Sequence, residues 1–268
     1  MNFGQLILEF RNIVKAKSSP VPLGNKILIF GHGRSGSTVL QNMLSPNDRC
    51  QDMGELLRER RNRQSANFLL KAGNVICRDF EYVDGLARHY LSKGRIQQIC
   101  AHIKPENIDY DIERFLDNAK SKGWIVLLLY RNVADVQISA VTAMITGHWH
   151  TRKDSQATET YHSEGLGLVD WQNPMLEGMK KKYRGNVRMQ RWGSQNSHFP
   201  CHYELDLRTL RNQSEFANRL RTCHPEVICN TSGITIRKNS KPNYSNEDLE
   251  AMNFLRREAK KMKEEKCI

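Results

Sequence analysis

A short glycine-rich stretch, Gly-His-Gly-Arg-Ser-Gly-Ser-Thr at residues 31–38, has the residue types of an anion-binding loop. It follows an apolar run of strand length and precedes an apolar pattern of helical spacing that begins near Ser37. At such a junction the unpaired backbone N–H groups of the helix start and the helix dipole both favour a negative charge. Gly33 and Gly36 permit the backbone angles and the close approach that the turn needs. The stretch therefore predicts a site for a phosphate group.

The glycine spacing fits the dinucleotide fingerprint G-x-G-x-x-G, which is weak evidence when it stands alone. That interpretation requires an acidic residue about 20 positions further on, at the end of a second strand. Asp52 and Glu55 stand at the right distance, but no apolar run precedes them. A nicotinamide dinucleotide is therefore poorly supported as the ligand.

The loop also resembles the Walker A pattern of P-loop kinases and ATPases, with Ser37 in the place of the lysine. That lysine neutralises charge on the β- and γ-phosphates during phosphoryl transfer. The apolar run at residues 124–130 ends in Arg131, where a magnesium-binding aspartate would be expected. The loop thus favours a ligand whose transferred group is not a γ-phosphate.

A second phosphate-binding pair follows the apolar run at residues 124–130. Arg131 leaves this buried strand and can direct two N–H donors onto one phosphate. Ser139 lies two turns into a helix predicted over residues 133–146, so its hydroxyl can reach the same group. Each residue has an ordinary structural explanation by itself, but together with the loop they favour a phosphate-binding role.

These two stretches resemble the motifs of sulfotransferases that use 3′-phosphoadenosine 5′-phosphosulfate (PAPS). "GRSGSTVLQNML" is similar to the family's 5′-phosphosulfate loop, and "LLLYRNVADVQIS" is similar to its 3′-phosphate motif. Weaker matches extend over most of the chain, through "HYELDLRTLRNQSEFANRL" and "ITIRKNSKPNYSNEDLEAM". The resemblance implies that PAPS is bound by Gly33, Arg34, Ser35, Gly36, Ser37, Thr38, Arg131, Ser139, Tyr203, Arg237 and Lys238.

The same resemblance implies which residues perform the chemistry. In tyrosylprotein and several carbohydrate or bacterial sulfotransferases, the general base is a glutamate about twenty residues after the loop arginine, in a Gly-Glu pair. Glu55 follows Gly54 and lies 21 residues after Arg34, so it is the first candidate. Lys104 matches the lysine that stabilises the bridging oxygen in those relatives. His102 shares a strand face with Lys104 and is the reserve base.

The elements that must position these residues alternate along the chain between strand and helix. Apolar runs at residues 26–30 and 124–130 predict strands, and residues 96–108 contain a further short predicted strand. Helical patterns follow each of them, one ended by Gly123. This alternation predicts an α/β fold, a three-layer, doubly wound parallel sheet with a P-loop-like nucleotide-binding topology. Residues 45–64 are predicted as a loop that enters a basic helix. Residues 201–209 include a further predicted strand, and a capped helix is predicted to begin near Ser245.

One sulfotransferase domain is predicted over residues 1–268, because no linker or composition break divides the chain. The polar segment 146–197 is predicted as an acceptor-side insertion or lid, in which His148, Trp149, His150 and His162 line an acceptor pocket. Metal ligation by these histidines is not supported, since their spacing matches no known ligand set. The basic runs at residues 58–63 and 180–184 are interpreted as solvated faces.

The net charge of +12 indicates an anionic partner. The seven cysteines are odd in number and scattered, which is typical of reduced thiols, and the N-terminal apolar stretch is too short for a membrane span. We therefore expect a cytoplasmic enzyme without a metal that sulfates a hydroxyl of a small metabolite or saccharide, such as a secondary metabolite. The alternatives are a P-loop nucleotide kinase or ATPase, and a non-catalytic module that binds nucleotide or nucleic acid.

Overall fold

The computed structural model describes residues 24–57, 79–108, 111–146, 165–231 and 244–265. These residues form two compact units. The first contains the described parts of Met1–His32, Gly36–Tyr130 and Arg188–Ile234. The second unit contains the described parts of Gly33–Ser35, Arg131–Val187 and Thr235–Ile268. The single domain expected over the whole chain stays a prediction.

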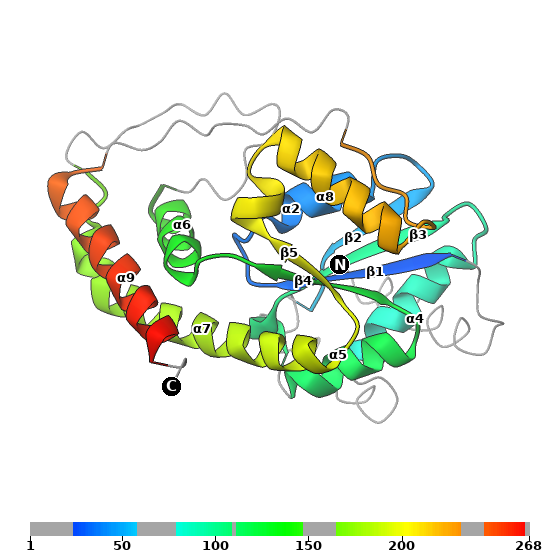
Figure 1. The fold of residues 1–268 in the computed structure, drawn as a ribbon, viewed down its shortest axis with the longest axis horizontal. Coiled ribbons are helices and arrows are strands. Elements are labelled where there is room, and N and C mark those ends of the chain that lie inside the picture. The colour runs from blue at the N-terminus through cyan, green and yellow to red at the C-terminus, as the bar shows by residue number, and fades with distance from the viewer. Residues whose placement is uncertain (1–23, 58–78, 109–110, 147–164, 232–243, 266–268) are drawn as a thin grey trace, which may run out of the picture. The chain divides into compact units, whose positions relative to one another are not determined.

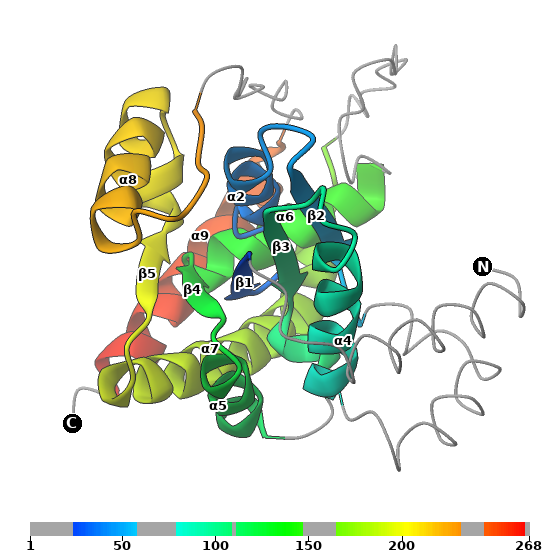
Figure 2. The same cartoon turned by 90° about the vertical axis from the view of Figure 1, so that its right-hand side faces the viewer.

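A five-stranded sheet forms the centre of the first unit (Figure 2). Its strands are β1 Asn25–Gly31, β2 Cys50–Glu55, β3 Gln98–Ile103, β4 Ile125–Tyr130 and β5 Phe199–His202. Their spatial order is β2-β3-β1-β4-β5, and every neighbouring pair is parallel. The carboxyl ends of all five strands therefore meet at one edge, where ligands bind in folds of this kind.

Helices cover both faces of this sheet, because its central strands are apolar on both sides (Figure 1). Leu28 and Phe30 of β1 pack in one buried cluster with α4 Asp79–Leu91 and α5 Ile112–Ser121. Ile27 and Ile29 pack in a second cluster with α2 Ser37–Leu44 and α8 Leu210–Cys223. The prediction of a three-layer, doubly wound α/β fold is thereby confirmed.

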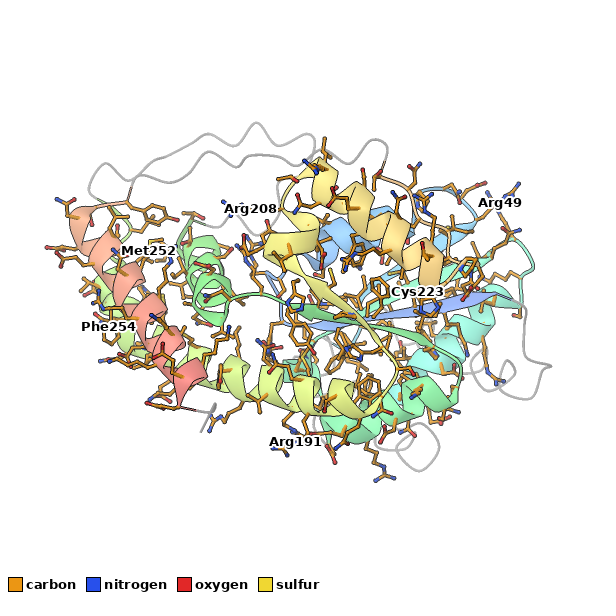
Figure 3. All side chains as sticks on the ribbon, in the orientation of Figure 1. Arg49, Arg191, Arg208, Cys223, Met252 and Phe254 are labelled. Carbon is orange, nitrogen blue, oxygen red and sulfur yellow. The ribbon has the colours of Figure 1, made fainter. Side chains whose placement is uncertain are left out.

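The second unit is built on helices α6 Val133–Thr146 and α9 Asn246–Glu264 and a short 3₁₀ turn, η2 Leu168–Trp171. Helix α7 Gln172–Gln195 contributes residues to both units. Met175 and Met179 of α7 pack with Leu255 and Met252 in the buried cluster of this unit, and Phe254 is partly buried against it. Figure 3 labels Met252 and Phe254 on α9. The predicted bounds of α6 and the predicted cap of α9 at Ser245 are both confirmed.

Two local predictions are wrong. Residues 50–55 form β2 instead of a loop, although the sequence CQDMGE is polar. An edge strand that pairs only with β3 can carry such residues, because solvent reaches one side of it. The strand predicted over residues 201–209 ends at His202, and Tyr203–Leu207 form a π-helical turn. The basic helix predicted after β2 lies outside the described residues.

Asp248 joins the start of α9 to the segment that precedes α7. Its carboxylate is fully buried and accepts hydrogen bonds from the backbone N–H groups of Leu166 at 2.7 Å and Leu168 at 2.6 Å. It also accepts one from the N–H of Ser245, whose hydroxyl caps the helix in return. Burial acts to raise the pKa of Asp248, but these donors outweigh it and hold the pKa below its usual range.

We expect Asp248→Asn to lower the free energy of unfolding by about 1–3 kcal/mol at pH 7, because the amide NH₂ would face N–H donors. A carboxylate with a lowered pKa stabilises the fold above its unfolded pKa of about 4, and this contribution is lost as pH falls through the lower native pKa. Urea unfolding from pH 3 to 7 measures both effects. The exposed Asp170→Asn, with the same change in charge, should stay within about 0.5 kcal/mol. Equal stability of the two variants would contradict the assignment.

Candidate functional site

The glycine-rich loop joins β1 to the N-terminus of α2. Gly31 at the end of β1 lies so close to Leu129 of β4 that an added Cβ would come within 2.6 Å of its carbonyl oxygen. Arg34 and Gly36 have positive φ angles of 65° and 96°, which turn the chain sharply before the helix. Gly36 is the N-cap residue of α2 and provides no side-chain cap. A helix start of this kind is suited to an anion.

Tyr203 lies directly against Gly36 within the first unit. A Cβ added to Gly36 would come within 2.5 Å of the tyrosine ring and within 3.2 Å of Leu207. The π-helical turn that carries both residues is fixed by Asp206, which accepts from the backbone N–H of His202 at 2.6 Å and pairs with Arg219. Tyr203 is therefore placed at the loop, and its role toward a cofactor stays a prediction.

The second unit brings the two predicted phosphate motifs into contact. Nη1 of Arg131 donates a hydrogen bond of 2.6 Å to the carbonyl oxygen of Arg34, although the two residues are 97 positions apart in the sequence. Nε of Arg34 donates to the hydroxyl of Ser139 at 3.1 Å. The guanidinium groups and the hydroxyl gathered here are donors of the type that binds phosphate oxygens.

Ser35 adds a buried hydroxyl to this group. Its side chain is 1 % exposed, and its Oγ makes no hydrogen bond to any described residue. A buried polar atom without a partner is costly in a folded protein. A phosphate or sulfate oxygen bound by the loop would supply the missing partner, so this atom fits an anionic ligand.

Glu55 and Lys104 meet at the carboxyl ends of β2 and β3, in the first unit. Their side chains form an ion pair of 2.6 Å, and each is only about a fifth exposed, at 21 % and 23 %. Nδ2 of Asn107 donates a long hydrogen bond of 3.4 Å to the same carboxylate. The structure thus brings the candidate base and the candidate stabilising lysine together, while their catalytic roles stay predictions.

His102 lies in β3, opposite Glu55 of β2 and two residues before Lys104. Its ring is 2 % exposed, and Nε2 donates to the carbonyl oxygen of Gly31 at 3.2 Å, since a carbonyl can only accept. Burial lowers the pKa of His102 to about 4. The neutral ring therefore makes a structural hydrogen bond, and the role of His102 as the reserve base stays a prediction.

A partly buried pair that the sequence did not predict lies beside these residues. Nδ1 of His32, in the glycine loop, is 2.9 Å from Oε1 of Glu106 in the turn after β3. The imidazole is 2 % exposed. The one indication in the sequence is that both residues closely follow strands that were themselves predicted, and carboxyl ends of parallel strands meet at one edge.

Several predicted residues lie outside the described part of the chain. They are Arg237, Lys238, His148, Trp149, His150 and His162, together with the basic run at 58–63. The basic run at 180–184 lies on α7, where Lys180 pairs with Glu177 at 2.7 Å. The described residues contain no cluster of histidine, cysteine and acidic side chains that could hold a metal ion. In the same ranges, no helix is long and apolar enough to span a membrane.

The order of the strands in the sheet argues against the interpretation of the loop as a nicotinamide dinucleotide site. In a dinucleotide-binding fold of the order 3-2-1-4-5-6, β2 lies beside β1, so that its terminal carboxylate reaches the ribose. Here β3 lies between β1 and β2, and Glu55 at the end of β2 pairs with Lys104. The nicotinamide interpretation therefore loses the acidic residue it requires.

Neither a protein-family model nor a curated protein sequence matches the chain. Among solved structures, a sulfotransferase domain from the Synechococcus PCC 7002 olefin synthase is similar to it. The similarity covers 90% of this chain and 90% of that domain, with 16% sequence identity and a TM-score of 0.44. At this level of similarity, the function must be argued from the residues of the site.

Proposed function

We propose that this protein is a sulfotransferase that transfers the sulfuryl group of PAPS to a hydroxyl of a small metabolite or saccharide and releases 3′-phosphoadenosine 5′-phosphate (PAP). The observation that carries the proposal is the contact of Arg34 with both Arg131 and Ser139. Two motifs separated by about a hundred residues were each expected to bind a phosphate of one donor molecule. Their contact supports a common ligand.

The donor is assigned to the residues as follows. Residues 33–38 bind the 5′-phosphosulfate through backbone N–H groups and hydroxyls, and the unpartnered Oγ of Ser35 supports this assignment. Arg131 and Ser139 bind the 3′-phosphate, which requires that Ser139 exchange its contact with Arg34 for the ligand. Tyr203, Arg237 and Lys238 are assigned to the remainder of the nucleotide on the family resemblance alone.

The chemistry requires a base and a positive charge. The acceptor oxygen attacks sulfur as its proton passes to the carboxylate of Glu55, and the bond between sulfur and the bridging oxygen breaks. That oxygen leaves as part of the 5′-phosphate of PAP and gains negative charge, which Lys104 stabilises. The ion pair of Glu55 with Lys104 supports these roles, because it places the carboxylate and the ammonium group side by side at the carboxyl ends of β2 and β3.

Two alternative functions remain in other classes. A P-loop kinase or ATPase would bind ATP and magnesium, but Ser37 occupies the position of the lysine on which that chemistry depends. A non-catalytic nucleotide- or nucleic-acid-binding module would use the positive charge of the chain, and its affinity for nucleic acid would fall steeply with salt. Neither alternative assigns a catalytic role to Glu55 or Lys104.

Thermal unfolding with added nucleotides tests the proposal. At a hundred times its dissociation constant, PAP should stabilise the fold by about 2.7 kcal/mol. Adenosine 5′-phosphate, which lacks the 3′-phosphate, is the matched control and should give a much smaller shift at equal concentration. A clear shift with ATP and magnesium beside none with PAP would reject the sulfotransferase. If PAP stabilises the fold as expected, a screen of hydroxylated compounds with labelled PAPS would identify the acceptor.

A further inference from the structure

The turn at residues 104–107, which follows β3, holds three contacts at the carboxyl edge of the sheet. Lys104 forms the 2.6 Å ion pair with Glu55, and Asn107 donates the long 3.4 Å hydrogen bond to the same carboxylate. Between them, Glu106 accepts from His32 at 2.9 Å. One short turn therefore connects the end of β2, which carries the base, with the end of β1, from which the glycine loop begins.

The backbone of this turn is well fixed. Pro105 stands at the first position of the 3₁₀ turn η1 Pro105–Asn107, where its ring restricts φ. The backbone N–H of Asn107 donates to the carbonyl oxygen of Lys104 at 2.9 Å, and that of Ile108 donates to Pro105 at 3.3 Å. The Cα–Cβ directions of Lys104, Glu106 and Asn107 are therefore set by the hydrogen-bonded backbone of this turn.

The contact between Glu106 and His32 fixes the imidazole. A carboxylate only accepts hydrogen bonds, so Nδ1 of His32 is the donor in this contact and carries the hydrogen. The ring is 2 % exposed, and it immediately precedes the residues assigned to the phosphosulfate. A shift of the Glu106 carboxylate would consequently move His32, which directly follows β1.

We infer that Glu106 and His32, both in the first unit, form a positioning pair that sets the distance between Gly36 at the start of α2 and the base Glu55. The inference rests on the proposed function, because it assigns the loop to the sulfuryl donor. Neither residue is required to touch the reacting atoms. The pair acts by holding the sulfur in line with an acceptor hydroxyl that Glu55 deprotonates, and misplacement of about 1 Å can cost about a hundredfold in rate.

The test compares Glu106→Ala with Glu106→Gln. The alanine variant should lose about 10- to 100-fold in kcat, with the KM of the acceptor and the affinity for PAP within about threefold of the parent chain. The glutamine variant should recover kcat to within about threefold, because its amide oxygen accepts the same hydrogen bond. The matched control is Glu226→Ala, which removes the exposed carboxylate that pairs with His224, and it should leave kcat unchanged.

Glu226 is a suitable control because it lies at the amino ends of the strands, away from Glu106. Its carbonyl oxygen accepts a hydrogen bond from the side chain of Asn25, the first residue of β1. A normal kcat in Glu106→Ala would overturn the inference. An equal loss in Glu106→Gln, with PAP still bound, would also overturn it, because the charge and not the hydrogen bond would then matter. If the parent chain itself showed neither PAP binding nor turnover, the proposed function would fail, and the inference with it.

Discussion

Replacing Glu55 by glutamine is expected to lower kcat by about 10²- to 10⁴-fold while PAP still binds with the affinity of the parent chain. Glutamine keeps the shape of the side chain, and its amide oxygen can still accept from Lys104, so the local structure should persist. The amide cannot take the proton of the acceptor hydroxyl. Steady-state kinetics with labelled PAPS, beside the thermal shift with PAP, separates the loss of chemistry from a loss of binding.

The control for this experiment is Glu226→Gln, the same change at the amino edge of the sheet, which should leave both measurements unaltered. Retained turnover in Glu55→Gln would contradict the assignment of the base and transfer it to His102. His102→Gln tests that outcome directly. We expect it to affect stability more than kcat, because the imidazole is buried and donates to the carbonyl oxygen of Gly31.

The central strands and the phosphate loop were predictable from the sequence because their determinants are local. The run WIVLLLY is apolar throughout, and only a strand buried on both faces accommodates it in an α/β fold. The spacing of Gly33 and Gly36 before Ser37 similarly predicts a tight turn into a helix. Arg131 and Ser139 were identified together through their resemblance to the 3′-phosphate motif, on a predicted strand end and the helix that follows it.

Strand β2 could not be predicted, because its sequence carries no apolar alternation. Cys50 is its one buried residue, and the strand exists because β3 provides a partner for its backbone. The hydrogen bond between His32 and Glu106 could not be predicted for a related reason. These residues are 74 positions apart, and only the placement of β3 beside β1 brings them together. Contacts of this kind depend on strand order, which periodicity does not encode.

The strand order also explains how one turn comes to contact both Glu55 and His32. Because β3 separates β2 from β1, Glu55 and the glycine loop lie at the ends of strands that are not neighbours. The residues after β3 are the ones placed to contact both. Lys104 and Glu106 do so in opposite directions, toward Glu55 and toward His32. A sheet with β2 beside β1 would not require this turn.

Replacing Arg131 by alanine should weaken PAP binding by about a hundredfold or more, because two charge-assisted hydrogen bonds to the 3′-phosphate are lost. Arg131→Lys keeps the charge but lacks the planar fork, so it should recover only part of the affinity. Ser139→Ala should cost about tenfold. Titration calorimetry with PAP measures each loss. Arg256→Ala, which removes an exposed partner of Asp135 on α6, is the matched control and should bind PAP normally.

Adenosine 5′-phosphate makes this experiment specific for the 3′-phosphate. Since it lacks that group, its affinity should change little in Arg131→Ala, and the difference between the two ligands measures the contact itself. An equal loss for both ligands would contradict the assignment. It would mean that Arg131 acts through its hydrogen bond to the carbonyl oxygen of Arg34, and therefore on the shape of the loop rather than on the nucleotide.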